Sequence, residues 1–185
     1  MLFPVFFDTC ALYGALVSDL ILRFAERRLY TPYWSRGVLD ELERVLGEHI
    51  GQDKAGKRIR QMESAFPDAL VCGYEDLIPG MRCSEEDRHV LAAACHSPAE
   101  TLVTFNVADF PRAATDPVGI EVRHPDDFLL DVFDLDPGTV GHICVSALRS
   151  YRQYPVTPNE FVELLVRSGV PRFASAIYPS LDALF

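Results

Sequence analysis

The sequence opens with Val5-Phe6-Phe7-Asp8-Thr9-Cys10, in which three bulky apolar residues lead into a single carboxylate. Such a run predicts a short strand that is buried on both faces, as in a parallel sheet. Pro4 keeps this strand short, because proline fits only at the start of a strand or at an edge. Ligands of open α/β sheets bind beyond the carboxyl ends of the strands. Asp8 is therefore predicted to be either a wall of an active site or the cap of a following helix.

Further along the chain, short apolar segments alternate with segments of helical periodicity. We expect strands over 30–34, 69–72, 101–104 and 120–122, and helices over 14–28, 35–46, 53–66 and 84–95. Strands that alternate with helices imply crossover connections. The predicted fold class is therefore α/β with a short parallel central sheet.

The last third of the chain has a different pattern. An acidic connector is expected over 116–136, and only helical patterns follow it. Asp136-Pro137 is typical of a helix start, Thr157-Pro158-Asn159-Glu160 matches a capping box, and Gly169 is placed to end that helix. A final short helix is expected over 173–184. We predict an α/β domain over residues 1–130 and a helical C-terminal appendage over 131–185.

Composition limits the class of protein. A hydrophobic content of 49% can build a real core, and no secretory signal or membrane span is evident. The five cysteines are scattered without a C-x-x-C pair, which favours reduced thiols and a cytoplasmic location.

The net charge of −10 argues against a general nucleic-acid coat, but the charge is unevenly distributed. Residues 1–60 hold 9 Lys and Arg against 8 acids, whereas residues 61–185 hold 8 against 19. Contact with a polyanion would therefore use the first third of the chain, and such contact would make binding salt-dependent. Solvated helix faces are the alternative explanation. The candidate residues for such contact are Arg23, Arg27, Arg28, Lys57 and Arg58.

Four acidic positions lie near predicted strand ends or helix starts: Asp8, Glu41, Asp87 and Asp109, the last with Asn106 close by. In a parallel sheet these positions can meet at one edge. Clustered carboxylates repel one another unless a cation is present, and hard oxygen ligands suit Mg²⁺ or Mn²⁺. The set suggests metal-assisted phosphodiester hydrolysis with one or two metal ions. Each acid also has a structural explanation, as a cap, a surface charge or a turn residue.

Four segments in order resemble the PIN-domain family over roughly residues 1–130. They are Val5–Thr9, Leu39–Leu46, Asp87–Ala94 and Val103–Pro111. The match looks closest to VapC-type toxins, including a group with a helical C-terminal extension. The resemblance implies a three-layer PIN fold and a Mg²⁺- or Mn²⁺-dependent endoribonuclease that acts on structured RNA, such as tRNA or rRNA, and is neutralised by a cognate antitoxin.

By position, the family's acidic residues fall on Asp8, Glu41 and Asp87, and the fourth falls on Asn106 or Asp109. All five are therefore expected metal ligands, directly or through water, and the four acids are the expected catalytic residues. Thr9 and Thr104 are expected to orient these groups.

The chain departs from the family pattern at two positions. Cys10 stands where Asn or Ser is usual, and Asn106 stands where many relatives have Asp. Two alternatives therefore stay open: a catalytically inactive PIN-like binding module, and a PIN nuclease of RNA maturation. A homodimer is a further expectation. The isolated His49, His124 and His142 are interpreted as surface or core residues.

Overall fold

The computed structural model describes residues 2–152, 155 and 157–184. The chain forms two compact units. One contains Met1–Tyr13 and Tyr30–His124, and the other contains Gly14–Leu29 and Pro125–Phe185. We call them the sheet unit and the helical unit. The division into domains at residue 130 stays a prediction.

The sheet unit is built on a five-stranded parallel sheet of order β3-β2-β1-β4-β5. Central strand β1 is Pro4–Phe7, and its Val5, Phe6 and Phe7 side chains are fully buried. The other strands are β2 Thr31–Ser35, β3 Leu70–Val71, β4 Thr101–Val103 and β5 Glu121–Arg123. The predicted α/β class and parallel sheet are confirmed.

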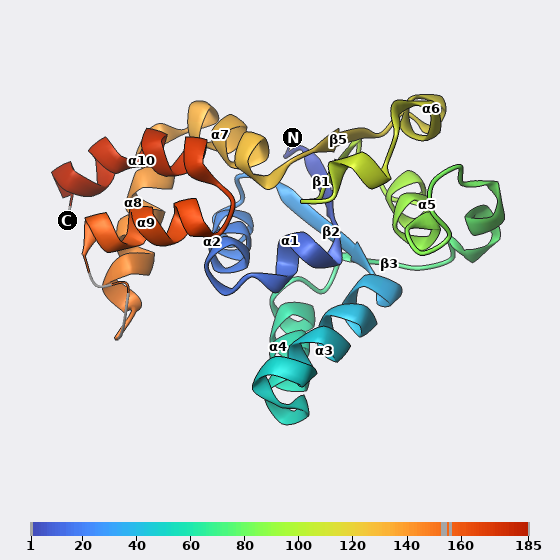
Figure 1. Cartoon of the computed structure of the whole chain (residues 1–185), viewed down its shortest axis with the longest axis horizontal. Helices are drawn as coiled ribbons and strands as arrows, with labels where there is room; N and C mark the ends of the chain where they lie inside the picture. The colour runs from blue at the N-terminus through green and yellow to red at the C-terminus, as the bar shows by residue number, and fades with distance from the viewer. Residues whose placement is uncertain (1, 153–154, 156, 185) are drawn as a thin grey trace. The chain divides into compact units, whose positions relative to one another are not determined.

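Helices cover the sheet (Figure 1). The α-helices of this unit are α1 Thr9–Tyr13, α3 Arg36–Ile50, α4 Gln52–Ala65, α5 Arg88–His96 and α6 Arg112–Thr115. Short 3₁₀ helices are η1 Glu75–Gly80, η2 Val107–Asp109 and η3 Asp116–Val118.

The strand order explains how these helices form layers. From β1 to β3 the chain steps in one direction, and it then crosses back to β4 and β5 on the other side of β1. Right-handed crossovers place the helices of these two directions on opposite faces of the sheet. Helices α3 and α4 therefore cover one face, whereas α5 covers the other. The strand order reverses between β1 and β4.

Three expectations about local structure need correction. The helix expected over 14–28 is α2 Ala15–Glu26, and the separate helix α1 already begins at Thr9, because extended Gly14 interrupts the run. The helix expected over 84–95 begins later, at Arg88, so that Asp87 is the N-cap of α5 and does not lie in its first turn. Besides β5, which matches the strand expected over 120–122, the acidic connector contains the unexpected helix α7 Pro125–Leu135. The acidic residues of this segment led to its interpretation as a connector, although Phe128, Leu129 and Val132 form the buried face of a helix.

The helical unit contains α2 and α7 together with α8 Pro137–Ser150, α9 Pro158–Arg167 and α10 Pro171–Leu184. In its core the rings of Phe24 and Phe173 meet edge to face at 6.3 Å. The predicted helix starts are confirmed: the Asp136 side chain accepts from Thr139 N at 3.0 Å, and Thr157 and Glu160 form a capping box. Gly169 follows α9 with a φ of 85°, a left-handed conformation that glycine adopts at little cost.

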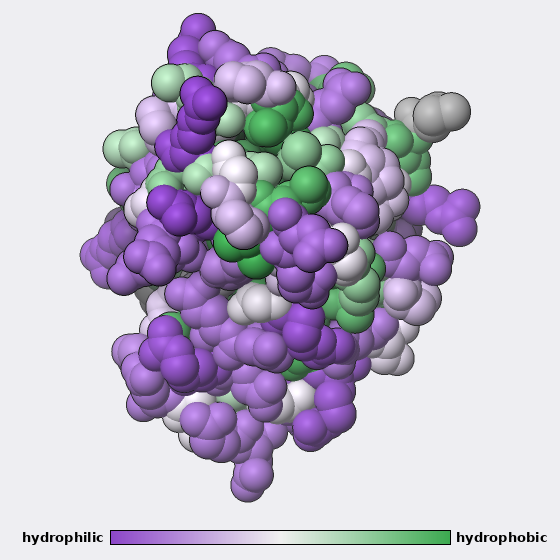
Figure 2. Space-filling view, turned by 90° about the vertical axis from the view of Figure 1, so that its right-hand side faces the viewer, coloured by the Kyte–Doolittle hydropathy of each residue, from purple (hydrophilic) through white to green (hydrophobic). Residues whose placement is uncertain are grey.

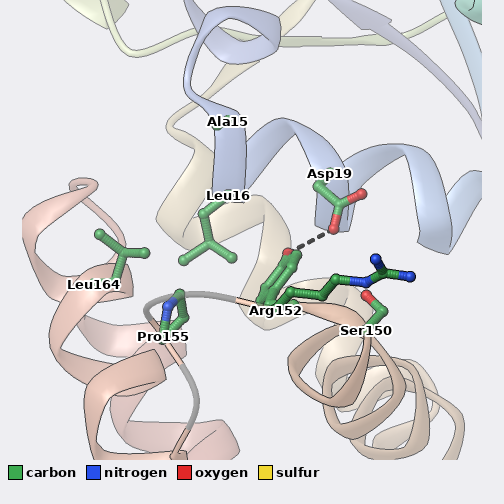
Figure 3. A pocket seen from close by; sticks show the side chains of 8 residues that line it. Ala15, Leu16, Asp19, Ser150, Arg152, Pro155 and Leu164 are labelled. Carbon is green, nitrogen blue, oxygen red and sulfur yellow. Dashed lines mark hydrogen bonds between the residues drawn. The ribbon is translucent and has the colours of Figure 1, made fainter.

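The helical unit also has an open pocket of about 550 Å³ (Figure 3). Asp19 of α2 and Tyr151 lie on its wall, where the Tyr151 hydroxyl donates to Asp19 Oδ2 at 2.6 Å. Burial and this bond raise the pKa of Tyr151. Leu16 and Leu164 supply apolar lining. The polar pair therefore ties α2 to the segment after α8.

The surface is mostly hydrophilic on the face that Figure 2 shows, with hydrophobic residues gathered in its middle and upper part. Exposed apolar side chains of the chain include Leu77, Val107 and Leu135. Single exposed residues of this kind are normal on a folded surface. Within the described residues, no helix combines the length and apolar character needed to cross a membrane.

Candidate active site

The candidate site lies where the strand order reverses. Asp8 follows β1 directly and its backbone N–H donates to Val103 O, the last residue of β4, at 3.1 Å. Thr104 follows β4. In open α/β sheets a ligand crevice forms at such a point, outside the carboxyl ends of the two diverging strands. The fold therefore places Asp8 where a bound ligand is expected.

Three donors hold the Asp8 carboxylate. Oδ1 accepts from the backbone N–H of Thr9 at 2.7 Å. Oδ2 accepts from the Thr104 hydroxyl at 2.8 Å and from the Cys10 thiol at 3.1 Å. Asp8 is only 6% exposed. The carboxylate is therefore buried and fixed in position by both the β1–α1 turn and the segment after β4.

Burial dominates the electrostatics of this carboxylate. Desolvation raises the pKa of Asp8, and the negative charge of Glu41 adds to the increase, whereas the bonds from Thr104, Cys10 and Thr9 oppose it. Burial likewise raises the pKa of Cys10 to about 11, with the Asp8 charge contributing. At neutral pH Cys10 is therefore a protonated thiol, which can donate to Asp8.

Thr9 links Asp8 to the second acid. Its hydroxyl donates to Glu41 Oε2 at 2.8 Å, while its N–H donates to Asp8. Glu41 lies on α3, whose start is capped by Ser35, the last residue of β2. The carboxyl end of β2 thus directs α3, and with it Glu41, toward Asp8. Thr9 and Thr104 both contact the acids that they were expected to orient.

A cavity of about 360 Å³ brings four of the five predicted ligands together. Asp8, Glu41, Asp87 and Asn106 all line it. Asp87 also accepts a bond from the Ser84 hydroxyl, which holds it at the start of α5. The remaining residue, Asp109, is exposed at the end of η2 and is not part of this lining.

The predicted RNA-binding residues are divided between the two units. Arg23 pairs with Asp19 at 2.9 Å in the helical unit. Arg27 and Arg28 are exposed there; Arg27 is the C-cap of α2, and Arg28 follows it with a φ of 60°.

In the sheet unit, Lys57 is exposed on α4. Arg58 is half-buried and donates to the Leu12 carbonyl at 2.7 Å, so it joins α4 to α1.

The cavity also has lining residues that the sequence analysis did not select: Tyr13, Val45, Glu48 and His49. Three of them follow Glu41 on α3 at spacings of four, seven and eight residues, which places them on one face of that helix. The sequence could therefore have identified these three residues, because their spacing from Glu41 predicts that they share its face of the helix. Tyr13 gave no such signal, since it ends the short helix α1.

The lining suits a hard divalent cation. Within residues 2–152, 155 and 157–184, no three His, Cys, Asp or Glu side chains converge closely enough to hold a metal ion by themselves. Mg²⁺ needs only one or two carboxylates, because it keeps several waters and takes other ligands from a phosphate substrate. A cation beside Asp8 and Glu41 would also offset their repulsion and the cost of burying Asp8. The donor set therefore fits Mg²⁺ or Mn²⁺.

Comparison with known proteins agrees with this architecture. A PIN domain model matches residues 4–108, and a model of the VapC50 C-terminal domain matches residues 125–179. A Mycobacterium tuberculosis protein named "Putative ribonuclease VapC50" is 40% identical over 115 residues, which cover 60% of this chain and 68% of that protein. No solved structure matches significantly. The chain therefore belongs to the PIN-domain family.

Proposed function

We propose that this protein is a metal-dependent endoribonuclease and the toxin of a VapBC-type toxin–antitoxin pair. The observation that carries the proposal is the cavity at the reversal point of the sheet, lined by Asp8, Glu41, Asp87 and Asn106. The name of the M. tuberculosis relative supports the choice of RNA as substrate.

Asp8, Glu41 and Asp87 would hold Mg²⁺ or Mn²⁺ together with its bound waters and with Asn106 as a further oxygen ligand. When bound, such an ion supplies positive charge that activates water and stabilises the charge on the attacked phosphate. The chain's own residues provide orientation, because Thr104 and Cys10 fix one oxygen of Asp8 and Thr9 fixes one oxygen of Glu41. Asn106 is better placed than Asp109 to complete the site, since it lines the cavity.

Cleavage assays with total tRNA and rRNA test the nuclease. We expect cleavage with Mn²⁺ or Mg²⁺, none in excess EDTA, and a loss of at least about 100-fold in Glu41→Gln and Asp87→Asn, a larger effect than loss of an outer-shell partner. Glu86→Gln is the control, since Glu86 is exposed and adjacent to Asp87 but is not part of the lining. Cleavage that persists in EDTA or in both site variants would refute the metal mechanism.

The toxin role needs a test in cells. Expression is expected to arrest growth, and co-expression of the neighbouring gene's product is expected to relieve the arrest. Cleavage in vitro without growth arrest would favour a nuclease of RNA maturation. Metal binding without cleavage of any RNA would favour an inactive PIN-like binding module.

Cys10 is expected to affect catalysis through Asp8. Cys10→Ala removes the thiol donor to Asp8 Oδ2 and should lower kcat by about 10-fold or more, the usual effect of losing a partner of a metal ligand. Cys10→Ser restores a donor and should recover most of the activity. Cys72→Ala, at an exposed cysteine, is the matched control. Equal kcat values for the Ala and Ser variants would show that the thiol does not position Asp8.

A further inference from the structure

Two aromatic rings form a corner on the wall of the acidic cavity. Tyr13 ends α1 and His49 lies near the end of α3, two helices that pack against each other (Figure 1). Their ring centroids are 5.7 Å apart and their planes meet at 76°. In an edge-to-face pair, each ring keeps at least one face that the other ring does not cover. We call Tyr13 and His49 the ring corner.

The orientation of His49 leaves one ring nitrogen for a ligand. Its Nδ1 lies 2.9 Å from the Val45 carbonyl oxygen. A carbonyl oxygen only accepts, so Nδ1 carries the hydrogen and Nε2 is the nitrogen that stays available. The His49 side chain is exposed although it also lines the cavity. It is therefore both oriented and accessible.

The charges around the cavity make this histidine significant. Four carboxylates line the cavity, those of Asp8, Glu41, Glu48 and Asp87. An RNA phosphate is repelled by all of them until a cation binds. Among the lining residues, which all belong to the described part of the chain, only His49 has a side chain that can carry positive charge. The corner is thus the part of the wall best suited to contact a polyanion.

We propose that the ring corner is an RNA contact site next to the acidic cavity. With both ring nitrogens protonated, His49 donates from Nε2 to a phosphate oxygen of the substrate, and the Tyr13 ring stacks against the base of the adjoining nucleotide. Stacking on an aromatic side chain accepts any base, so the contact favours single-stranded or unpaired RNA without selecting a sequence. This inference rests on the proposed nuclease function and deepens it, since it names how the substrate is held.

Binding is measured apart from cleavage. His49→Ala, Tyr13→Ala, His49→Arg and Tyr13→Phe are each added to Asp8→Asn protein and titrated with a short fluorescein-labelled single-stranded RNA in Mg²⁺. Tyr13→Ala should weaken binding about 5-fold or more, as expected for one lost base contact, and His49→Ala should weaken binding and lessen its dependence on salt, as expected for one lost phosphate contact. His49→Arg keeps a cationic donor and Tyr13→Phe keeps a ring, so both should bind like the Asp8→Asn parent. His96→Ala, an exposed histidine at the end of α5, is the matched control.

The kinetic measurement uses the same changes in protein that retains Asp8. The KM for RNA should rise about 5-fold or more in Tyr13→Ala, and should also rise in His49→Ala, with kcat nearly unchanged in both, because these contacts hold the substrate without touching the reacting atoms. A fall in kcat alone would contradict the proposal. The midpoints of thermal unfolding should stay equal, and Tyr13→Phe separates loss of the ring from damage to the fold.

The two proposals can fail separately. If the protein cleaves RNA and both alanine variants match their parents in Kd and KM, the proposal that the ring corner binds RNA is wrong and the nuclease proposal is retained. If no RNA is cleaved but the alanine variants lose RNA binding, the nuclease proposal is wrong and the proposal that the ring corner binds RNA is retained. Absence of RNA binding by the Asp8→Asn parent itself would refute the proposal that the ring corner binds RNA.

Discussion

Asp8→Asn is expected to abolish RNA cleavage and at the same time to make the metal-free protein more stable. The loss of activity should be at least about 100-fold, more than the 10- to 100-fold typical of an outer-shell partner, because Asp8 is proposed to hold the ion directly. The gain in stability follows from the burial of Asp8. A buried carboxylate that lies near Glu41 is costly to ionise.

The sign of the pH dependence follows from the same shift. Burial raises the pKa of Asp8 in the folded chain above its ordinary value of 3.8. The folded state then holds the proton more tightly than the unfolded state, so stability falls as the pH rises through the folded-state pKa. Asparagine does not ionise, so the Asp8→Asn protein does not undergo this pH-dependent loss of stability. The advantage of Asp8→Asn should therefore be absent below the ordinary pKa and should grow as the pH rises.

Thermal unfolding in EDTA, from acidic to neutral pH, measures this effect. Added Mn²⁺ should raise the unfolding temperature of the parent protein more than that of Asp8→Asn, which lacks one carboxylate but keeps Glu41, Asp87 and Asn106 in the cavity lining, because a ligand stabilises only the state that binds it. An Asp8→Asn protein that is less stable than the parent at neutral pH would show that the three hydrogen bonds to Asp8 outweigh the cost of its burial.

Asp126→Ala is expected to cause a large loss of stability in the helical unit. Asp126 is 6% exposed, and its two carboxylate oxygens accept from the N–H groups of Arg172 at 3.1 Å and Phe173 at 2.9 Å. These groups lie in the first turn of α10, where Val170 precedes Pro171 and has no side-chain acceptor. Asp126 thus caps α10 from helix α7. Removing it should cost about 3 kcal/mol, since a buried donor is left without its charged partner.

The neighbouring Asp127 provides the matched control. Its carboxylate pairs with the Arg172 guanidinium, but the side chains are 40% and 67% exposed. Exposed ion pairs contribute about 1 kcal/mol or less, so Asp127→Ala should change stability little. Urea unfolding of the two variants measures the difference, and hydrogen exchange of the α10 amides locates it. Equal losses in both variants would mean that Asp126 does not cap α10.

Sequence patterns predicted the parts of this protein that depend on neighbouring residues. The apolar run from Val5 to Phe7 forms the central strand, and the capping pattern of Thr157 and Glu160 forms as predicted. These features depend on local periodicity and on contacts within one turn. Prediction failed for α7, because its acidic residues were interpreted as a connector and the buried apolar face of the helix was overlooked.

The candidate site was predictable to the extent that a parallel sheet gathers strand ends at one edge. That rule, with the family resemblance, selected Asp8, Glu41, Asp87 and Asn106, which line one cavity. It could not choose between Asn106 and Asp109. The choice depends on the η2 turn, which leaves Asn106 in the lining and carries Asp109 away from it.

By itself, then, the sequence determined the strands, most of the helices and which acids follow them, because these depend on side-chain pattern along the chain. Only the tertiary structure decided the remaining roles. It buries the Cys10 thiol, which raises the thiol pKa to about 11, and places that thiol as a donor to Asp8 Oδ2. It brings α2 together with the C-terminal helices, and it supplies α10 with a cap from 46 and 47 residues away. Each of these depends on desolvation or on contacts between distant segments, which exist only once the chain has packed.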